Sequence, residues 1–220
     1  MSDMGTTGPA RQPSASGAGT SVRQVVAFDF DGTLTIRDSF TAFLKWRAGP
    51  VGWSMALVRL VPAAVRYLGH RDRGRIKAEA VAAVLGGLTR AEVEVEADRF
   101  AGEVWTRFMR PDALDVWNDW GRKGAHRVIV TASPEITVAP FARRLGAENL
   151  IGTRMAFDDQ DRVTGGFTGP NCRGEEKVRR LRAEYGDDVR ILAAYGDTSG
   201  DTEMLAAAEQ PGFRVFRKRP

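Results

Sequence analysis

The fold is decided by the stretch Val25-Val26-Ala27-Phe28-Asp29-Phe30-Asp31-Gly32-Thr33-Leu34-Thr35. An apolar run typical of a buried strand reaches two acids, Asp29 and Asp31, and a Gly-Thr pair then ends it. Ligands of open α/β sheets bind beyond the carboxyl ends of the strands, so the pattern predicts a central strand that carries two carboxylates to that edge. Such neighbours repel each other unless a cation or a raised pKa relieves them. A strand end with two solvated acids is the alternative interpretation of this stretch taken alone.

Composition limits the classes of protein that fit. The length of 220 residues fits one domain, or one domain with a sizeable insertion, and a hydrophobic content of 43% suffices for a core. Cys172 is the single cysteine, so no intrachain disulfide forms and a cytoplasmic location is expected. The net charge of +4 suits an anionic substrate or membrane surface and is too small to indicate nucleic acid as a partner. Residues 1–22 are expected to be a disordered tail, because they hold few large apolar side chains and lack the apolar core of a secretory signal.

Residues 38–110 contain almost no strand pattern. Helices are expected at about 39–48, 51–68, 73–85 and 89–109, the first two separated by Gly49-Pro50 and the last opened by a capping box at Thr89 and Glu92. We interpret residues 38–110 as an all-helical cap inserted into a core domain formed by residues 23–37 and 111–220. A helical bundle packed for stability alone would give the same pattern.

The remainder of the chain alternates strands and helices. After a helix at 112–122, strands are expected at 127–131, 149–153 and 191–195, with a hairpin over 155–164 and an edge strand at 213–216. Helices are expected at 134–145, 175–183 and 202–208. This alternation predicts an α/β fold with a doubly wound parallel sheet.

Polar groups follow three of these strands. They are Asp29 with Asp31, Thr131, and Asp197 with Asp201, and Lys177 lies in the first turns of the helix before the last strand. Parallel strands bring their carboxyl ends to one edge of a sheet, so these side chains are expected to converge. Several carboxylates in one crevice require a hard cation such as Mg²⁺, and a hydroxyl and an ammonium beside it suit a phosphate-like ligand.

In order and spacing these groups resemble the signatures of the haloacid dehalogenase (HAD) superfamily of aspartate-nucleophile phosphatases. The four signatures stand here as Asp29-Phe30-Asp31-Gly32-Thr33, Thr131, Lys177 and Gly196-Asp197-Thr198-Ser199-Gly200-Asp201. The resemblance runs from about Val25 to the C-terminus. It implies a Rossmann-like core, and the helical insertion after the first signature resembles the cap of the phosphoserine phosphatase-like branch, subclass IB.

The resemblance also implies a role for each residue. Asp29 would attack phosphorus and form an aspartyl-phosphate, and Asp31 would act as general acid and then general base. Mg²⁺ would be held by the carboxylates of Asp29 and Asp197 and by the backbone carbonyl of Asp31.

Further groups would hold the phosphate. These are Thr131, Lys177 and the backbone N–H near Ala132, with Asp201 orienting Lys177 or contacting metal-bound water. Ser133 remains an alternative to Thr131, and Arg173 an alternative to Lys177.

The substrate is expected to be a small or amphiphilic phosphomonoester. Phosphoserine phosphatases carry a Glu nine residues after the nucleophile, where this chain has Asp38, so phosphoserine itself is disfavoured. The apolar segment 51–68 contains Arg59 and Arg66, and the chain also resembles phosphatidylglycerophosphatase C-type enzymes, whose cap is comparably apolar. A lipid phosphatase in peripheral contact with the inner membrane face is therefore the alternative. A non-catalytic phosphate- or membrane-binding protein is the alternative of another class.

Overall fold

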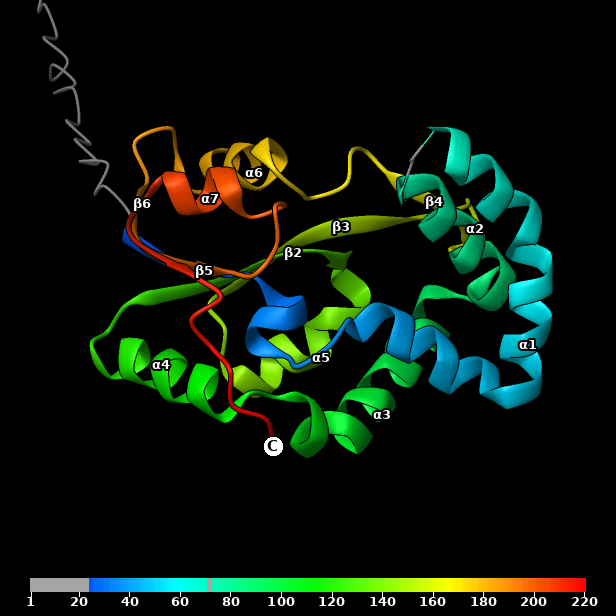
Figure 1. Cartoon of the computed structure of the whole chain (residues 1–220), viewed down its shortest axis with the longest axis horizontal. Coiled ribbons are helices and arrows are strands. Elements are labelled where there is room, and N and C mark those ends of the chain that lie inside the picture. The colour runs from blue at the N-terminus through cyan, green and yellow to red at the C-terminus, as the bar shows by residue number, and fades with distance from the viewer. Residues whose placement is uncertain (1–23, 71–72) are drawn as a thin grey trace, which may run out of the picture.

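The computed structural model describes residues 24–70 and 73–220, with residues 59–70 and 73–76 described for their backbone alone. The tail expected at residues 1–22 lies outside the described residues. A six-stranded sheet crosses the molecule with helices on both of its faces (Figure 1). Its strand order is β4-β3-β2-β1-β5-β6, which places the first strand of the chain in the interior of the sheet.

The strands confirm the expected doubly wound architecture. They are β1 (Gln24–Phe28), β2 (His126–Pro134), β3 (Asn149–Phe157), β4 (Val163–Thr168), β5 (Arg190–Gly196) and β6 (Ala208–Phe213). β1 pairs in parallel with β2 and with β5, and β2–β3 and β5–β6 are also parallel. Among the described strands, β3 and β4 form the one antiparallel pair, at the position of the expected hairpin.

Helices cover the sheet from both sides because β1 is apolar on both of its faces. The helices are α1 (Ser39–His70), α2 (Arg73–Leu85), α3 (Arg90–Phe108), α4 (Pro111–Arg122), α5 (Glu135–Leu145), α6 (Glu175–Tyr185) and α7 (Thr202–Ala206). Val25 and Ala27 face the layer of α6 and α7, where they share a buried cluster with Leu181. Val26 and Phe28 belong to the opposite cluster, with side chains of α4 and α5.

The expected helix boundaries in the insertion are mostly found. α1 is kinked at Gly49, whose φ of 64° and ψ of 177° leave the helical region, so the predicted break appears as a change of direction within one element. Thr89 caps α3 with the full capping box, since its side chain accepts from the Glu92 N–H and Glu92 accepts from the Thr89 N–H.

The inserted helices pack directly on the sheet layer. Phe100 of α3 lies with its ring centroid 6.2 Å from that of Phe141 in α5, and Arg144 pairs with Asp98 across the same contact. The segments that lead into and out of the insertion lie side by side and are joined by a hydrogen bond, in which the Ile36 N–H donates to the Phe108 carbonyl at 2.8 Å. The division into a cap at 38–110 and a core remains a prediction.

The expected strand at 213–216 was wrong. The edge strand is β6, at Ala208–Phe213, and the helix before it ends at Ala206. β6 pairs with β5 alone, so Pro211 is tolerated at the edge although it lacks an N–H. Phe216, whose aromatic character suggested a strand, instead packs its ring 5.2 Å from that of Tyr195. β2 also continues past the expected end at Thr131 to Pro134.

Candidate active site

A cavity of about 510 Å³ opens at the carboxyl ends of the central strands. Strand ends supply most of its wall, and the inserted segment and two loops supply the rest. The lining residues are Asp29, Asp31, Gly32, Ile36, Arg37, Asp38, Lys77, Arg110, Thr131, Ala132, Ser133, Asn171, Arg173, Asp197 and Thr198. Side chains from the carboxyl ends of β1, β2 and β5 therefore line one cavity, as the sequence predicts.

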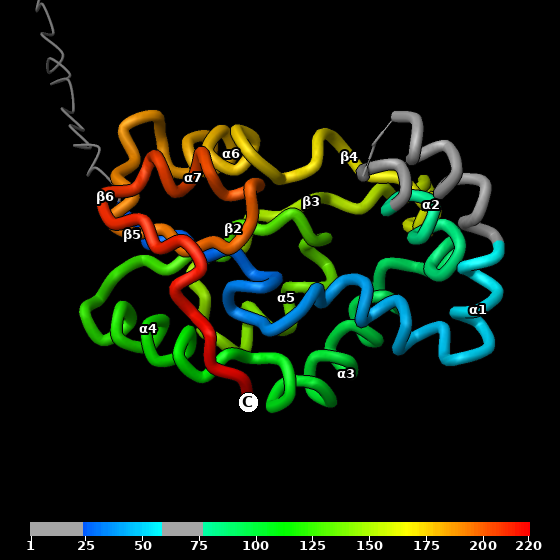
Figure 2. The backbone as a smooth tube through the Cα atoms, in the orientation of Figure 1, coloured from blue at the N-terminus to red at the C-terminus, as the bar shows by residue number. Residues whose placement is uncertain are grey.

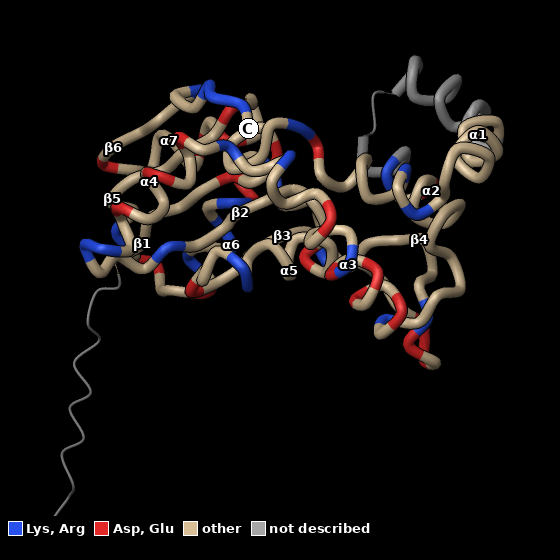
Figure 3. Tube along the Cα trace, turned by 90° about the horizontal axis from the view of Figure 1, so that it is seen from below, with Lys and Arg blue, Asp and Glu red and all other residues tan. Residues whose placement is uncertain are grey.

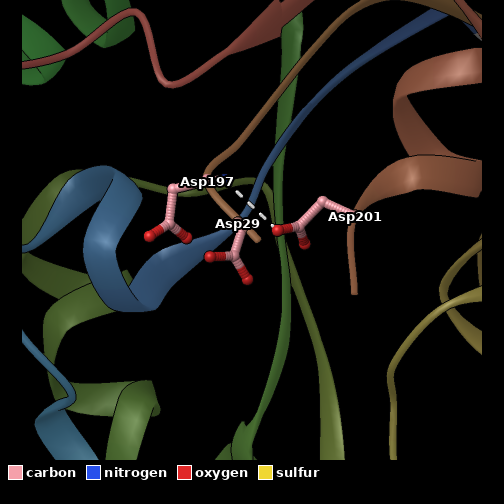
Figure 4. A group of neighbouring side chains, drawn as sticks. All are labelled: Asp29, Asp197 and Asp201. Atoms are coloured by element: carbon pink, nitrogen blue, oxygen red, sulfur yellow. Dashed lines mark hydrogen bonds between the residues drawn. The ribbon is translucent and has the colours of Figure 1, made fainter. Parts of the chain in front are cut away.

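Three carboxylates meet at this edge. Asp29 follows β1, Asp197 and Asp201 follow β5, and one oxygen of each lies within 4.8 Å of the others (Figure 4). The turn after Asp29, η1 (Phe30–Leu34), approaches Asp197 so closely that a Cβ on Gly32 would lie 2.3 Å from Asp197 Oδ2. Gly32 also has a φ of 85°, so both its space and its backbone conformation require glycine.

Lys177 is buried beneath these carboxylates, with 1% of its surface exposed. Its Nζ donates to Asp29 Oδ1, Asp201 Oδ1 and the Val130 carbonyl, each at 2.6 Å, so all three donors are used. Burial opposes the charge of this ammonium, but the two carboxylates raise the pKa of Lys177 above its usual range. Lys177 thus joins the predicted group, although it contacts Asp29 rather than lining the cavity.

Asp201 has both oxygens engaged. Oδ2 accepts from the N–H of Asp197 and from the N–H and hydroxyl of Thr198, at 3.0–3.2 Å, and Oδ1 accepts from Lys177. Burial alone would raise the pKa of Asp201, but Lys177 and these donors lower it. Asp197 is different, because its Oδ1 is buried without a hydrogen-bond partner among the described residues.

The surroundings of Asp29 and Asp197 raise the pKa of both carboxyl groups. Burial raises the pKa of Asp29 to about 7, with Lys177 acting in the opposite direction. Burial and the charge of Asp201 raise the pKa of Asp197. A hard divalent cation relieves such a pair of oxygen donors, and the unpartnered Asp197 Oδ1 fits a ligand atom. The donors present at Asp29 and Asp197 therefore fit Mg²⁺.

The Asp31 carboxyl group is bonded to residues outside the three-carboxylate cluster. Its Oδ1 accepts from the Ser39 N–H at 2.6 Å and its Oδ2 from the Ser133 hydroxyl at 2.5 Å. Burial, followed by the charge of Asp38, raises the pKa of Asp31. Its carboxyl group is thus held in place and retains a proton more readily than an exposed aspartate, whereas its carbonyl as a metal ligand remains a prediction.

The two candidate hydroxyls of β2 have different surroundings. The Ser133 hydroxyl is bonded to Asp31, and Thr131 Oγ1 accepts from the Ser133 N–H at 3.0 Å. The contact between Ser133 and Asp31 was missed at the sequence level. Side chains alternate between the two faces of a strand, so residues 131 and 133 lie on one face. This spacing is the sequence signal from which the contact between Ser133 and Asp31 could have been predicted. Ala132 lies between them on the cavity wall, and phosphate binding by its N–H remains a prediction.

Other cavity residues carry no local signal in the sequence. Lys77 comes from α2 and its Nζ lies 3.3 Å from the Ala132 carbonyl, so the insertion delivers a cation to the cavity. Arg173, the alternative to Lys177, also lines the cavity and donates to Ser199 Oγ at 2.9 Å. Both residues are brought here by contacts between distant segments.

Comparison with known proteins identifies the family. The model of haloacid dehalogenase-like hydrolases matches residues 26–206. The chain belongs to this family. Protein CicA from Caulobacter vibrioides is 58% identical over 196 residues, which cover 89% of this chain and 88% of that protein. A probable phosphatase from Mycobacterium tuberculosis is 28% identical over 202 residues, 87% of this chain and 68% of that protein.

Two solved structures share the fold. A Bordetella pertussis protein of unknown function superposes with a TM-score of 0.70 at 24% identity, covering 85% of this chain and 87% of that one. A phosphoserine phosphatase, solved as an analogue of its phospho-aspartyl intermediate, gives a TM-score of 0.55 at 19% identity, covering 86% and 84%. The prediction of an enzyme of the HAD phosphatase class is confirmed at the level of the family.

Proposed function

We propose that this enzyme is a Mg²⁺-dependent phosphomonoesterase that works through an aspartyl-phosphate on Asp29. One observation carries the proposal: a buried Asp29, paired with Lys177, lines the same cavity as Asp197, which lies close to it, and as Asp31, which is held separately by Ser133. A cavity that only bound phosphate would have no need of an acid two residues beyond a carboxylate nucleophile.

In the first half-reaction, an oxygen of Asp29 attacks phosphorus and the bond from phosphorus to the ester oxygen breaks. The departing alkoxide takes a proton from Asp31, whose raised pKa and hydrogen bonds from Ser133 and Ser39 keep a protonated carboxyl group in place. The products of this half-reaction are the free alcohol, an aspartyl-phosphate and an ionised Asp31.

In the second half-reaction, water attacks the phosphorus of the aspartyl-phosphate. Asp31 takes the proton of that water, and the bond between phosphorus and the Asp29 oxygen breaks to release inorganic phosphate. Asp29 returns as a carboxylate and Asp31 as an acid, so the cycle closes with no other proton donor.

Several groups would support both steps. Asp29 and Asp197, with the Asp31 carbonyl, would hold Mg²⁺, which supplies positive charge next to the phosphate oxygens. Thr131 and the Ala132 N–H would hold phosphate oxygens, Lys177 would hold the Asp29 carboxylate through its ion pair, and Arg173 is a further cation at the cavity wall. Asp201 accepts from Lys177 and from the loop of Asp197, so we assign it the orientation of both.

The substitution Asp29→Asn tests the proposal. It should abolish Mg²⁺-dependent turnover of p-nitrophenyl phosphate and the acid-stable, hydroxylamine-labile phosphoenzyme, while the far-UV spectrum stays that of the wild type. Asp159→Asn, at an exposed aspartate, is the matched control and should keep full activity. Retained turnover in Asp29→Asn would reject the mechanism.

A lipid or otherwise amphiphilic phosphomonoester is the second candidate substrate. The observation that favours it is the α1 apolar cluster, defined by Val51, Met55, Leu57 and Val58, whose exposed fractions are 74%, 54%, 48% and 71%. α1 contains no Asp or Glu along its 32 residues, so the helix that displays this cluster carries only positive charge. Apolar side chains on a basic helix suit an anionic lipid surface. In the described part of the chain, no helix combines the length and the apolarity needed to cross a bilayer.

Vesicle flotation and a substrate panel distinguish the two candidates. For a lipid substrate, the protein should float with anionic vesicles, and phosphatidylglycerophosphate should be turned over faster than a soluble phosphomonoester. Replacing Val51, Met55 and Val58 by Ser should remove flotation and leave turnover of the soluble substrate unchanged. Absence of flotation together with equal turnover of both substrates would leave the small phosphorylated metabolite as the substrate class.

A further inference from the structure

The last residues of the chain form a connection that the catalytic signatures do not include. Residues 214–218, the C-terminal strap, leave β6 and run across the molecule to the start of α4 (Figure 2). At one end, Arg214 contacts the loop of Asp197. At the other end, the Asp112 carboxylate accepts from the N–H groups of Arg217 and Lys218, at 2.7 and 2.9 Å. The strap therefore links the loop after β5 to the beginning of α4, where the chain leaves the insertion.

Arg214 fixes the backbone of Asp197 from the side opposite Asp201. Its Nε donates to the Asp197 carbonyl at 2.7 Å, and its backbone N–H donates to the Gly196 carbonyl at 2.9 Å. The N–H of Asp197 is held by Asp201 Oδ2. Both polar groups of the Asp197 backbone are thus bonded, which fixes the point of the main chain from which its carboxylate extends.

The backbone of Arg214 is strained. Its φ of 52° lies in the left-handed region, and among the described residues Asp161 is the other non-glycine residue with a positive φ. A glycine would adopt this conformation without cost, whereas other residues lose about 1 kcal/mol or more. An arginine in this place keeps a side chain that a glycine would lack, and that side chain bonds to the Asp197 carbonyl.

The other end of the strap is connected through Arg110 to the turn beside the Asp197 carboxylate. Arg110 Nη1 donates to the Lys218 carbonyl, and its Nε donates to the carbonyls of Gly32 and Thr35, each at 3.2 Å. Gly32 is the residue whose missing Cβ leaves room for the Asp197 carboxylate. The strap thus braces both the loop that bears Asp197 and the turn against which its carboxylate lies.

We infer that Arg214 is a positioning residue for Asp197 and, through it, for the divalent cation site. The inference rests on the proposed function, because that proposal places the cation on Asp29 and Asp197. Groups that orient a metal ligand typically contribute about tenfold to a hundredfold to metal affinity. Removal of the Arg214 side chain should therefore weaken Mg²⁺ binding while the fold and the affinity for substrate at saturating Mg²⁺ are kept.

Calorimetric titration of the full-length protein with Mg²⁺ alone tests this. Arg214→Gly relieves the backbone strain and removes the bond to the Asp197 carbonyl, so the Mg²⁺ dissociation constant should rise about tenfold while the melting temperature does not fall. Arg214→Asn tolerates the left-handed conformation and should behave alike. Asp161→Gly relieves the same strain away from the cavity and should bind Mg²⁺ as the wild type does. At saturating Mg²⁺, kcat and KM of Arg214→Gly should approach the wild-type values.

The outcomes separate this inference from the proposed function. Wild-type Mg²⁺ affinity in both Arg214 variants would overturn the role of Arg214 and leave the proposed mechanism intact. A lower melting temperature with unchanged affinity would also overturn it, because the strap would then serve stability alone. If the wild type itself shows no saturable Mg²⁺ binding, or Asp197→Asn binds as tightly, the proposed cation site fails and this inference fails with it.

Discussion

The residues beneath the cavity and the exposed residues of α1 differ in how their side chains are partnered. Lys177 is 1% exposed, and each of its donors meets an oxygen of Asp29, Asp201 or Val130. Val51 and Val58 of α1 are 74% and 71% exposed, on a helix without an acid in its sequence. Figure 3 shows acidic and basic residues interspersed over the region of the sheet. Partners inside the chain fix Lys177, whereas Val51 and Val58 are mostly exposed to solvent.

The largest effect is expected from breaking the buried pairs. Lys177→Met leaves Asp29 and Asp201 buried together without their cation, which should cost about 3–5 kcal/mol of unfolding free energy. Activity should fall by more than about a thousandfold. Urea unfolding and turnover of p-nitrophenyl phosphate measure the two losses.

Lys123→Met is the matched control, because Lys123 pairs with Asp119 on the surface and is 58% exposed. Its effect should stay below about 1 kcal/mol, as for other surface pairs. Similar losses in both variants would contradict the distinction between buried and exposed charges.

A smaller effect is expected from Ser133→Ala, which removes the hydroxyl bonded to Asp31. The general acid then loses its orientation, and kcat should fall about tenfold to a hundredfold. An alkyl phosphate should suffer more than p-nitrophenyl phosphate, because an alkoxide needs the proton and a nitrophenolate leaves without it. Ser54→Ala, at an exposed serine of α1, is the control. An equal loss with both substrates would show that Ser133 acts on something other than proton transfer.

The affinity for Mg²⁺ should depend on pH through Asp29. The pKa of this carboxyl group in the folded protein is about 7, above its ordinary value of 3.8, so the metal-free protein is protonated there below pH 7. A cation must displace that proton, so affinity should rise by at most about tenfold per pH unit up to about pH 7 and then level off. The same linkage means that the stability contributed by the proton on Asp29 is lost as pH rises through that pKa.

Calorimetric titrations between about pH 5.5 and pH 8.5 measure this dependence. In Asp29→Asn the group that titrates is absent, so any remaining Mg²⁺ binding should not change over this range. A flat profile for the wild type would show that Asp29 does not exchange a proton for the cation over this range.

The smallest effect is expected at the α1 apolar cluster. Replacing Val51, Met55 and Val58 by Ser should change the free energy of unfolding by no more than about 0.5 kcal/mol each, because these side chains are already exposed. Phe43→Ala, at a fully buried position of the same helix, should cost about 3–5 kcal/mol. Thermal unfolding compares the two. A large loss in the serine variant would mean that the cluster is packed inside the fold.

Much of the site could be predicted from the chain because its residues sit at fixed points of regular elements. Asp29 and Asp197 follow apolar strands, Thr131 lies within β2 near its carboxyl end, and parallel pairing of β1 with β2 and β5 brings them together. The edge strand could not be placed in this way. β6 contains Glu209, Pro211 and Gly212, which disfavour a strand locally, and it exists because β5 offers it a pairing partner.

The sequence by itself determined the alternation of strands and helices, the acids at the strand ends and the capping of α3, since each depends on residues close together in the chain. Tertiary structure alone decided that Ser133 holds Asp31, that Lys77 reaches the cavity from α2, and that Arg214 bonds to the carbonyl of Asp197. Those contacts join residues separated by 17 to 102 positions. Local preferences end within a few residues, so only the packing of whole elements fixes which distant side chains meet.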